Sequence, residues 1–206
     1  MRLFGRTGLV ACALLASAMT GPAHAASDAN GAISDLYATL TQTMHRGAQL
    51  GDKGRYEALA PAIHRDFDLT RMAQLAIGPG WANLSPAERQ QVTDAFTRYT
   101  IATYASEFSK DSGVKFEIAG THAMPYGTVV DTQLVQADGD KTAINYLMRQ
   151  NGDRWQIADI YLQGTISQIA NLRSQFSAVV LHGGAQALVD TLNRKTASLI
   201  PETAAS

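Results

Sequence analysis

The chain of 206 residues carries 17 lysines and arginines against 18 acidic residues, and 46% of it is hydrophobic. A formal net charge of −1 argues against nucleic-acid binding and against electrostatic docking on anionic membranes, because both depend on a basic surface. Cys12 is the only cysteine, so the remaining chain has no disulfide or thiol chemistry and depends on a hydrophobic core for stability.

Residues 1–25 have the three-part layout of a cleaved signal peptide: two arginines, an apolar run, and the small-residue triplet Ala23-His24-Ala25. We expect cleavage after Ala25, which leaves about 180 residues, the size of one domain. The run ending in Cys12 also resembles a lipoprotein processing box, but a long apolar stretch follows the cysteine. The apolar run is too short to span a membrane.

Helical spacing of apolar residues predicts two helices in the first part of the domain, over residues 32–49 and 56–64, separated by the glycine-rich run 51–54. Asp68 is suited to cap a third helix, and Gly78 is suited to end it.

A capping box marks the start of a fourth helix. Ser85 is the N-cap, Pro86 occupies the first helical position, and Glu88 follows three residues after the serine. The helix can run to Phe108. Its apolar positions spread over more than one stripe, which predicts a central helix with neighbours on two sides.

After this helix the hydrophobic period changes from 3.6 to 2, which indicates strands. Four strands are predicted at 114–120, 126–136, 141–149 and 154–164. The turns between the last three are short, so we expect an antiparallel meander.

The segment after Gly164 predicts another helix, and Gly183-Gly184 separates it from a last one. Residues 197–206 are predicted to be a disordered tail. The apolar stripe of the helix after Gly164 is formed by Ile166, Ile169, Ala170, Phe176 and Val180. Arg173 projects near the middle of that stripe.

Helices followed by strands and then helices predict an α+β fold in which several helices cover one twisted four-stranded antiparallel sheet. Such a sheet can enclose a cone-shaped apolar cavity. The histidines lie far apart without His, Cys or acidic neighbours at metal-ligand spacing, and dinucleotide, phosphate-loop and G-x-S-x-G motifs are lacking. We therefore expect no metal, cofactor or catalytic residue. One enzymatic alternative stays open, in which Asp131, Tyr146 and Asp159 act as acid and base in the cavity.

Two segments carry a family resemblance. "FDLTRMAQLAIGPGWANLSPAERQQVTDAFTRYTIATYASEF" and "WQIADIYLQGTISQIANLRSQF" resemble, in order and spacing, motifs of the MlaC (toluene-tolerance) periplasmic lipid-binding proteins. The resemblance spans about residues 32–196. In the segment that corresponds to the residues between Gly164 and Arg173, phospholipid carriers of this family usually show a serine-rich turn and an aromatic residue before the arginine. The variant "TISQIANLRSQF" resembles the hopanoid-associated HpnM branch instead.

The resemblance implies an NTF2-like α+β fold over residues 26–196, with lipid acyl chains in a cavity between sheet and helices. It implies a non-enzymatic periplasmic carrier of phospholipid or hopanoid. The partners that it implies are an outer-membrane lipoprotein complex and an inner-membrane MCE-domain ABC transporter. The competing readings are a hydratase-like or isomerase-like cavity enzyme on the same fold, with Asp131 and Tyr146 as acid and base, and an adaptor without ligand.

The expected lipid-binding residues combine the large apolar side chains around the predicted cavity with one arginine. They are Phe67, Met72, Leu75, Ala76, Trp81, Tyr99, Tyr104, Phe108, Val130, Ile144, Tyr146, Met148, Ile160, Leu162, Ile166, Ile169 and Arg173. The apolar pattern alone does not separate a lined pocket from a filled core.

Arg173 needs a partner if it is buried on an apolar stripe, because an isolated buried charge costs several kcal/mol. Asp159 is the preferred partner, since it precedes the turn at Gly164 and can lie beside the returning helix. The alternative is that Arg173 lies at the cavity mouth and meets a lipid phosphate.

Overall fold

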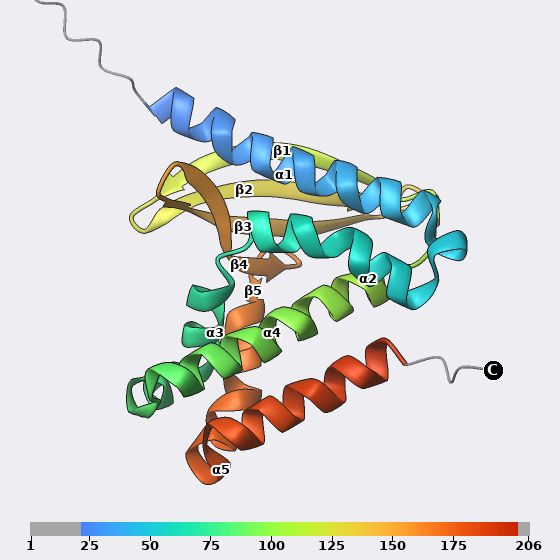
Figure 1. Ribbon diagram of the computed structural model, residues 1–206. Coiled ribbons are helices and arrows are strands. Elements are labelled where there is room, and N and C mark those ends of the chain that lie inside the picture. The colour runs from blue at the N-terminus through green and yellow to red at the C-terminus, as the bar shows by residue number, and fades with distance from the viewer. Residues whose placement is uncertain (1–21, 202–206) are drawn as a thin grey trace, which may run out of the picture.

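The computed structural model describes residues 22–201, so most of the predicted signal segment lies outside the described residues. Figure 1 shows the helices and strands in chain order. The elements are α1 (Pro22–His45), α2 (Gly47–Asp66), α3 (Leu69–Ile77), the 3-10 helix η1 (Gly78–Asn83), α4 (Pro86–Glu107), β1 (Lys115–Met124), β2 (Gly127–Val135), β3 (Lys141–Asn151), β4 (Arg154–Leu162), β5 (Ile166–Ser167) and α5 (Gln168–Leu199). The predicted α+β class is confirmed.

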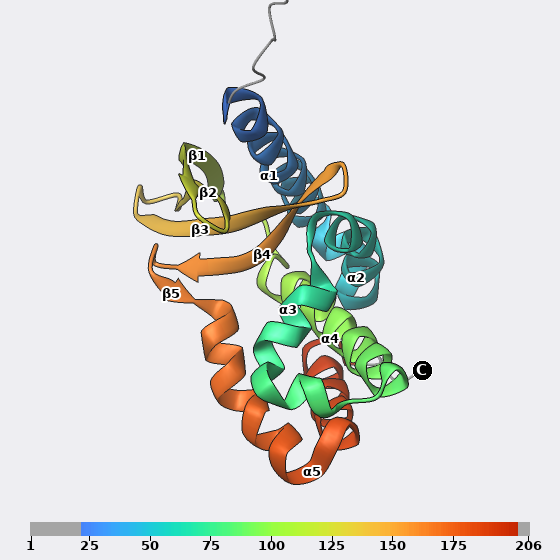
Figure 2. The same cartoon turned by 90° about the vertical axis from the view of Figure 1, so that its left-hand side faces the viewer.

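The strands form one antiparallel sheet in the order β1-β2-β3-β4-β5, which confirms the predicted meander and adds a two-residue fifth strand. The register places Val130 opposite Tyr146, and Tyr146 opposite Ile160. Figure 2 shows how the sheet curves away from the helices below it. Consecutive pairing follows from the short turns, which leave neighbouring strands no other partner.

The helices cover one side of the sheet unequally. α1 lies along β1 and β2 and also contacts β4, whereas α2, α3 and α5 contact β4 (Figures 1 and 2). α4 packs on α2, α3 and α5 and makes no extensive contact with any strand. The central helix is therefore held mainly by other helices, and side chains fill the distance between it and the sheet.

Three helix starts follow from side-chain caps. The Asp68 carboxylate accepts a hydrogen bond from the Arg71 amide at 3.1 Å, and the Ser85 amide donates to the Glu88 carboxylate at 2.8 Å. The Ser167 hydroxyl accepts from the Ala170 amide at 3.0 Å. The first two caps confirm the predicted helix starts, because capping depends on residues three apart in the sequence.

The predicted breaks at glycines are found as kinks within longer helices. Gly51 has φ 62° inside α2, and Gly184 has φ 68° inside α5. Within the predicted linker 51–54, only Gly51 has a non-helical conformation, and residues 52–54 are helical. α1 ends earlier than predicted, at His45.

The prediction of which residues form the apolar stripe after Gly164 is partly wrong. Ile166 lies in β5 and is 44% exposed, and Ala170 and Arg173 are exposed on α5. The Ser167 cap starts the helix at Gln168, and its buried face is formed by Ile169, Leu172, Phe176 and Val180. Leu172 therefore takes the central position expected for Arg173.

The C-terminal helix runs further than expected. α5 continues through Leu199, which is half-buried, and Ile200 packs against the main core. Apolar contacts thus order the first residues of the segment predicted to be disordered, whereas residues 202–206 lie outside the described chain.

Candidate functional site

The sheet side that faces the helices, called here the inner face, is apolar. Val130, Tyr146 and Ile160 form one row across three strands and are 0%, 3% and 4% exposed. Met148 pairs with Ile157 in the next row, and both are fully buried. The opposite, outer face has its own small cluster of Val129, Leu147 and Ala158, as expected from the alternation of side chains along strands.

One end of the inner face is only partly covered by helices, through rings such as Tyr37 of α1, which stacks on Phe116. We call it the uncovered end, and its residues are Phe116, Ile118, Leu134, Ile144 and Leu162. The first four are half-buried, and Leu162 is 37% exposed. These residues point the same way as the buried rows, so the apolar surface continues from the core to solvent.

A narrow crevice opens beside the buried rows. It is lined by Phe67, Met72, Phe96, Tyr99, Thr100, Thr103, Tyr104, Ile160, Gln168 and Leu172, and its volume is about 20 Å³. Ile160 and Leu162 lie two residues apart on the same face of β4, so the crevice and the uncovered end are adjacent. Together they form an apolar surface between α4, α5 and the sheet.

Aromatic rings connect the crevice to the uncovered end. The ring centroid of Tyr104 lies 5.3 Å from that of Phe67 and 5.5 Å from that of Phe108. Phe108 lies 5.8 Å from Phe116, which stacks on Tyr37 at 4.4 Å. The rings bridge helices and sheet where α4 itself stands away from the strands.

Hydroxyl groups are embedded in this apolar surface. Tyr37 and Thr132 share a buried hydrogen bond of 2.6 Å between their hydroxyl oxygens, and the Thr132 hydroxyl also contacts the Ile144 carbonyl. Burial raises the pKa of Tyr37 and Tyr146, so both phenols are neutral at physiological pH. The site therefore presents neutral polar groups within an apolar wall.

Most of the predicted site residues meet at this surface. Those lining the crevice or the inner face are Phe67, Met72, Tyr99, Tyr104, Val130, Ile144, Tyr146, Met148, Ile160 and Leu162. Phe108 reaches the uncovered end through Phe116. Sequence reasoning missed Phe96, Thr100, Thr103, Gln168 and Leu172. The spacing of Phe96 and Thr100 from Tyr104, and of Thr103 from Tyr99, could have signalled a shared face of α4.

The other predicted residues lie elsewhere. Leu75, Ala76 and Ile169 belong to helix packing in the main core. Trp81 lies in η1, where the Arg89 guanidinium stands 5.8 Å from the ring centroid. Ile166 lies at the sheet edge in β5.

The predicted pairing of Arg173 with Asp159 is wrong. The Asp159 carboxylate accepts instead from the Ser167 hydroxyl at 2.6 Å and from the Ile169 amide at 3.1 Å. The Arg173 guanidinium lies against Gly78, and it forms no ion pair with any residue between 22 and 201. The carboxylate is satisfied by the start of α5, and the exposed arginine needs no buried partner.

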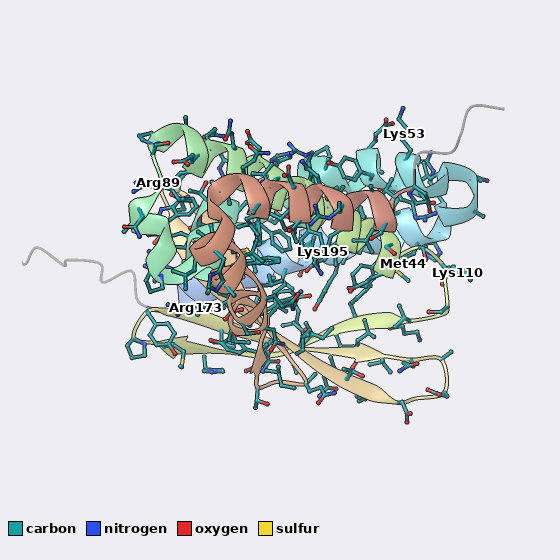
Figure 3. The ribbon with its side chains drawn as sticks, turned by 90° about the horizontal axis from the view of Figure 1, so that it is seen from below. Met44, Lys53, Arg89, Lys110, Arg173 and Lys195 are labelled. Carbon is teal, nitrogen blue, oxygen red and sulfur yellow. The ribbon has the colours of Figure 1, made fainter. Side chains whose placement is uncertain are left out.

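A different cation lies on an apolar helix stripe. Lys195 falls between Leu188, Leu192 and Leu199 at helical spacing and is half-buried, and within the described chain it forms no ion pair. Figure 3 shows it on the second half of α5, well apart from Arg173 on the first half. A lysine tolerates such a position because its stem packs on apolar surface while the ammonium reaches water.

The alternative acid and base pair is not assembled. Tyr146 belongs to the inner face, whereas Asp131 follows the inward-facing Val130 and therefore points to the outer face. There the Asp131 carboxylate lies 2.8 Å from His122 Nδ1. The two candidate groups are thus separated by the sheet.

Residues 22–201 contain no group of three or more His, Cys, Asp or Glu side chains placed to hold a metal ion. None of the described helices is both long and apolar enough to cross a bilayer.

A larger groove of about 440 Å³ lies where η1 meets the kink of α5. Its wall includes Leu181, which is 78% exposed, and Glu88, which is occupied by the α4 capping box. None of the predicted site residues lines it. We favour the crevice as the site despite its size, because it leads between the layers, where an acyl chain is removed from water on all sides.

A model of the MlaC protein family matches residues 34–194. The chain belongs to the MlaC family. Seven chains of solved structures also match. One is a phospholipid-binding protein from Ralstonia solanacearum, solved in complex with a phospholipid. It is 23% identical, with a TM-score of 0.72 over 85% of this chain and 98% of that chain. This likeness shows that the chain described here has the same fold as the Ralstonia solanacearum protein. The comparison with curated proteins finds no match.

Proposed function

We propose that the chain is a non-enzymatic lipid carrier that binds a phospholipid between the sheet and the helices. The observation that carries the proposal is the continuous apolar surface from the crevice to the uncovered end of the sheet. The phospholipid bound to the Ralstonia solanacearum protein supports the same ligand class. Burial of acyl chains supplies the affinity, at about 0.8 kcal/mol for each methylene.

The lipid enters by displacing side chains. A space of about 20 Å³ holds one water molecule rather than an acyl chain. Phe67, Tyr99 and Tyr104 line the crevice with long side chains that a ligand must push aside, and α4 makes no extensive contact with the strands. Entry of an acyl chain therefore requires these side chains to move apart.

The cellular setting is part of the proposal. We infer cleavage of the signal peptide after Ala25, release into the periplasm, and exchange of lipid with an outer-membrane lipoprotein complex and an inner-membrane MCE-domain ABC transporter. Membership of the MlaC family supports this setting. A hopanoid is the alternative ligand, and Arg173 remains a candidate headgroup contact at the surface.

Native mass spectrometry on protein purified from its own periplasm tests the function. We expect one co-purified phospholipid per chain. Thr103→Trp places a large ring in the crevice from a half-buried position, and should lower occupancy about tenfold or more. Gln91→Trp, on an exposed position of the same helix, is the matched control and should keep its lipid.

Two other results of the mass spectrometry would change the proposal. A co-purified hopanoid would replace the proposed ligand class. Ligand-free wild-type protein that also fails to take up phospholipid from vesicles would overturn the carrier function.

A further inference from the structure

α4 carries a carboxylate on the face that lines the crevice. That face is formed by Phe96, Tyr99, Thr100, Thr103 and Tyr104. At about 100° per residue, Glu107 falls in the middle of the same face, one turn after Thr103 and Tyr104. The next residue, Phe108, contacts Phe116 at the uncovered end. Glu107 therefore lies where the crevice meets the uncovered end of the sheet.

The surroundings of Glu107 are those of a group in a concave surface. Its side chain is exposed, yet burial among neighbouring atoms raises its pKa. Both observations hold when a side chain lines a depression, with protein on most sides and solvent on one. Burial also raises the pKa of Tyr104 and Tyr146, and the negative charge of Glu107 adds to both shifts. Tyr104 lies three residues before Glu107 on α4, so the two side chains are neighbours on one helix face.

No basic side chain in the described part of the chain pairs with the charge at this position. Glu107 forms no ion pair within residues 22–201, and the last turn of α4 contains no basic residue. The helix dipole also disfavours a negative charge at a C-terminus. An unpaired carboxylate here destabilises the folded chain.

The hydroxyl of Tyr104 is a second polar group without a protein partner. Tyr104 is 8% exposed and its ring packs between those of Phe67 and Phe108. Among the described residues, the Tyr104 hydroxyl oxygen forms no hydrogen bond. Arg71 Nε is the one side-chain atom there that lacks both a hydrogen-bond partner and contact with solvent, so the Tyr104 oxygen still touches solvent. A buried hydroxyl that borders the crevice is free to bond a ligand.

We propose that Glu107 and the Tyr104 hydroxyl form a polar subsite for a lipid headgroup, an inference that rests on the proposed function. The subsite binds a hydrogen-bond donor of the headgroup, which is an ammonium or a hydroxyl. The carboxylate accepts from that donor, and the phenol donates to a neighbouring ligand oxygen. A headgroup that is a phosphate alone brings a second negative charge beside the carboxylate and is disfavoured. The subsite therefore selects the headgroup, while the crevice holds the acyl chains.

A competition between three phospholipids with identical acyl chains tests the subsite. Delipidated protein is mixed with phosphatidylethanolamine, phosphatidylglycerol and phosphatidic acid, and bound lipid is counted by native mass spectrometry. Wild type should prefer the ethanolamine lipid over phosphatidic acid about tenfold, the scale of one charge-assisted hydrogen bond. Equal preference for the glycerol lipid extends the donor class from an ammonium to a hydroxyl.

Glu107→Gln should reduce this preference to about threefold or less. Glu57→Gln, an exposed acidic residue on α2, is the control and should keep the wild-type preference. The subsite is overturned if wild type binds all three lipids equally, or if Glu107→Gln keeps the preference. Failure of wild type to bind any of the three lipids overturns the carrier function instead.

A stability measurement separates a binding role from a structural one. Because burial raises the pKa of Glu107, the folded state disfavours its charged form. The charged Glu107 carboxylate destabilises the folded chain fully at pH values above its pKa in the folded state. It has no such effect at pH values below its pKa in the unfolded chain, about 4.3. Tyr104 and Tyr146, the neighbouring titratable groups, stay neutral throughout. Delipidated Glu107→Gln should thus match wild type at pH 4 and melt higher at pH 7. A lower melting temperature at pH 7 contradicts the proposal.

Discussion

Asp159 shows how a buried carboxylate can be satisfied without a cation. It lies near the end of β4, where α5 returns beside the strand, and it accepts from the Ser167 hydroxyl and the Ile169 amide. The positive end of the helix dipole also favours a carboxylate there. Asp159 therefore fixes where α5 begins, and the start of α5 in turn decides that Leu172 rather than Arg173 points into the core.

A double-mutant cycle between Arg173 and Asp159 tests this assignment. Arg173→Met should change the free energy of unfolding by about 0.5 kcal/mol or less, since the side chain is exposed. Asp159→Asn should cost about 1–2 kcal/mol, because the Ser167 and Ile169 donors lose a charged acceptor. The two effects should add. A coupling energy above about 1 kcal/mol, measured by urea unfolding of delipidated protein, would restore the ion pair.

Arg55 is the buried cation that sequence reasoning did not find. It is 7% exposed, and its guanidinium donates to the Ala105 carbonyl at 2.9 Å and the Gly47 carbonyl at 3.0 Å, besides pairing with Asp52. These bonds join the α1–α2 junction to the last turns of α4. No periodic pattern marks such a residue, because its partners are backbone carbonyls from distant segments.

At the scale of elements, two glycines set the paths of α2 and α5. Gly51 and Gly184 combine positive φ with extended ψ, a conformation that is essentially limited to glycine. Each lets one helix turn and pack on both sides of the kink. After the turn at Gly184, Ala185, Leu188 and Leu192 become buried.

Alanine substitutions at two glycines should therefore have opposite effects. Gly184→Ala should destabilise the chain by about 1–3 kcal/mol through backbone strain alone, since a new Cβ would meet no atom within 4 Å. Gly31→Ala, at an exposed position in α1 with equally free space, should stabilise it by about 0.5–1 kcal/mol. Thermal or urea unfolding measures both, and a neutral Gly184→Ala would mean that the fold does not need this conformation.

These elements also show what can be predicted from the sequence. Ser85 with Glu88, and Asp68 with Gly78, act over a few residues, so their helix ends were predictable. The face of α5 was not, because a one-residue difference in its start moves every side chain by about 100°. The crevice combines residues from α3, α4, α5 and β4, and only tertiary packing brings Phe96 and Gln168 together.

At the scale of the whole molecule, the helices and the sheet are joined unevenly. α1, α2, α3 and α5 contact strands, whereas α4 reaches the sheet only through its side chains. The crevice follows this weaker junction, and the apolar surface continues to the uncovered end. The central claim of the proposed carrier function is that an acyl chain inserts along α4 and separates side chains without breaking strand pairing.

Photo-crosslinking with a phospholipid that carries a diazirine at the end of one acyl chain tests this claim most directly. After irradiation of the loaded protein, peptide mass spectrometry locates the labelled residues. Labels should fall on the crevice walls, at residues 96–104 of α4 and at Ile160 of β4, and should disappear in Thr103→Trp. Labels concentrated at the groove around Leu181, or on the outer face around Leu147, would contradict binding between the sheet and the helices.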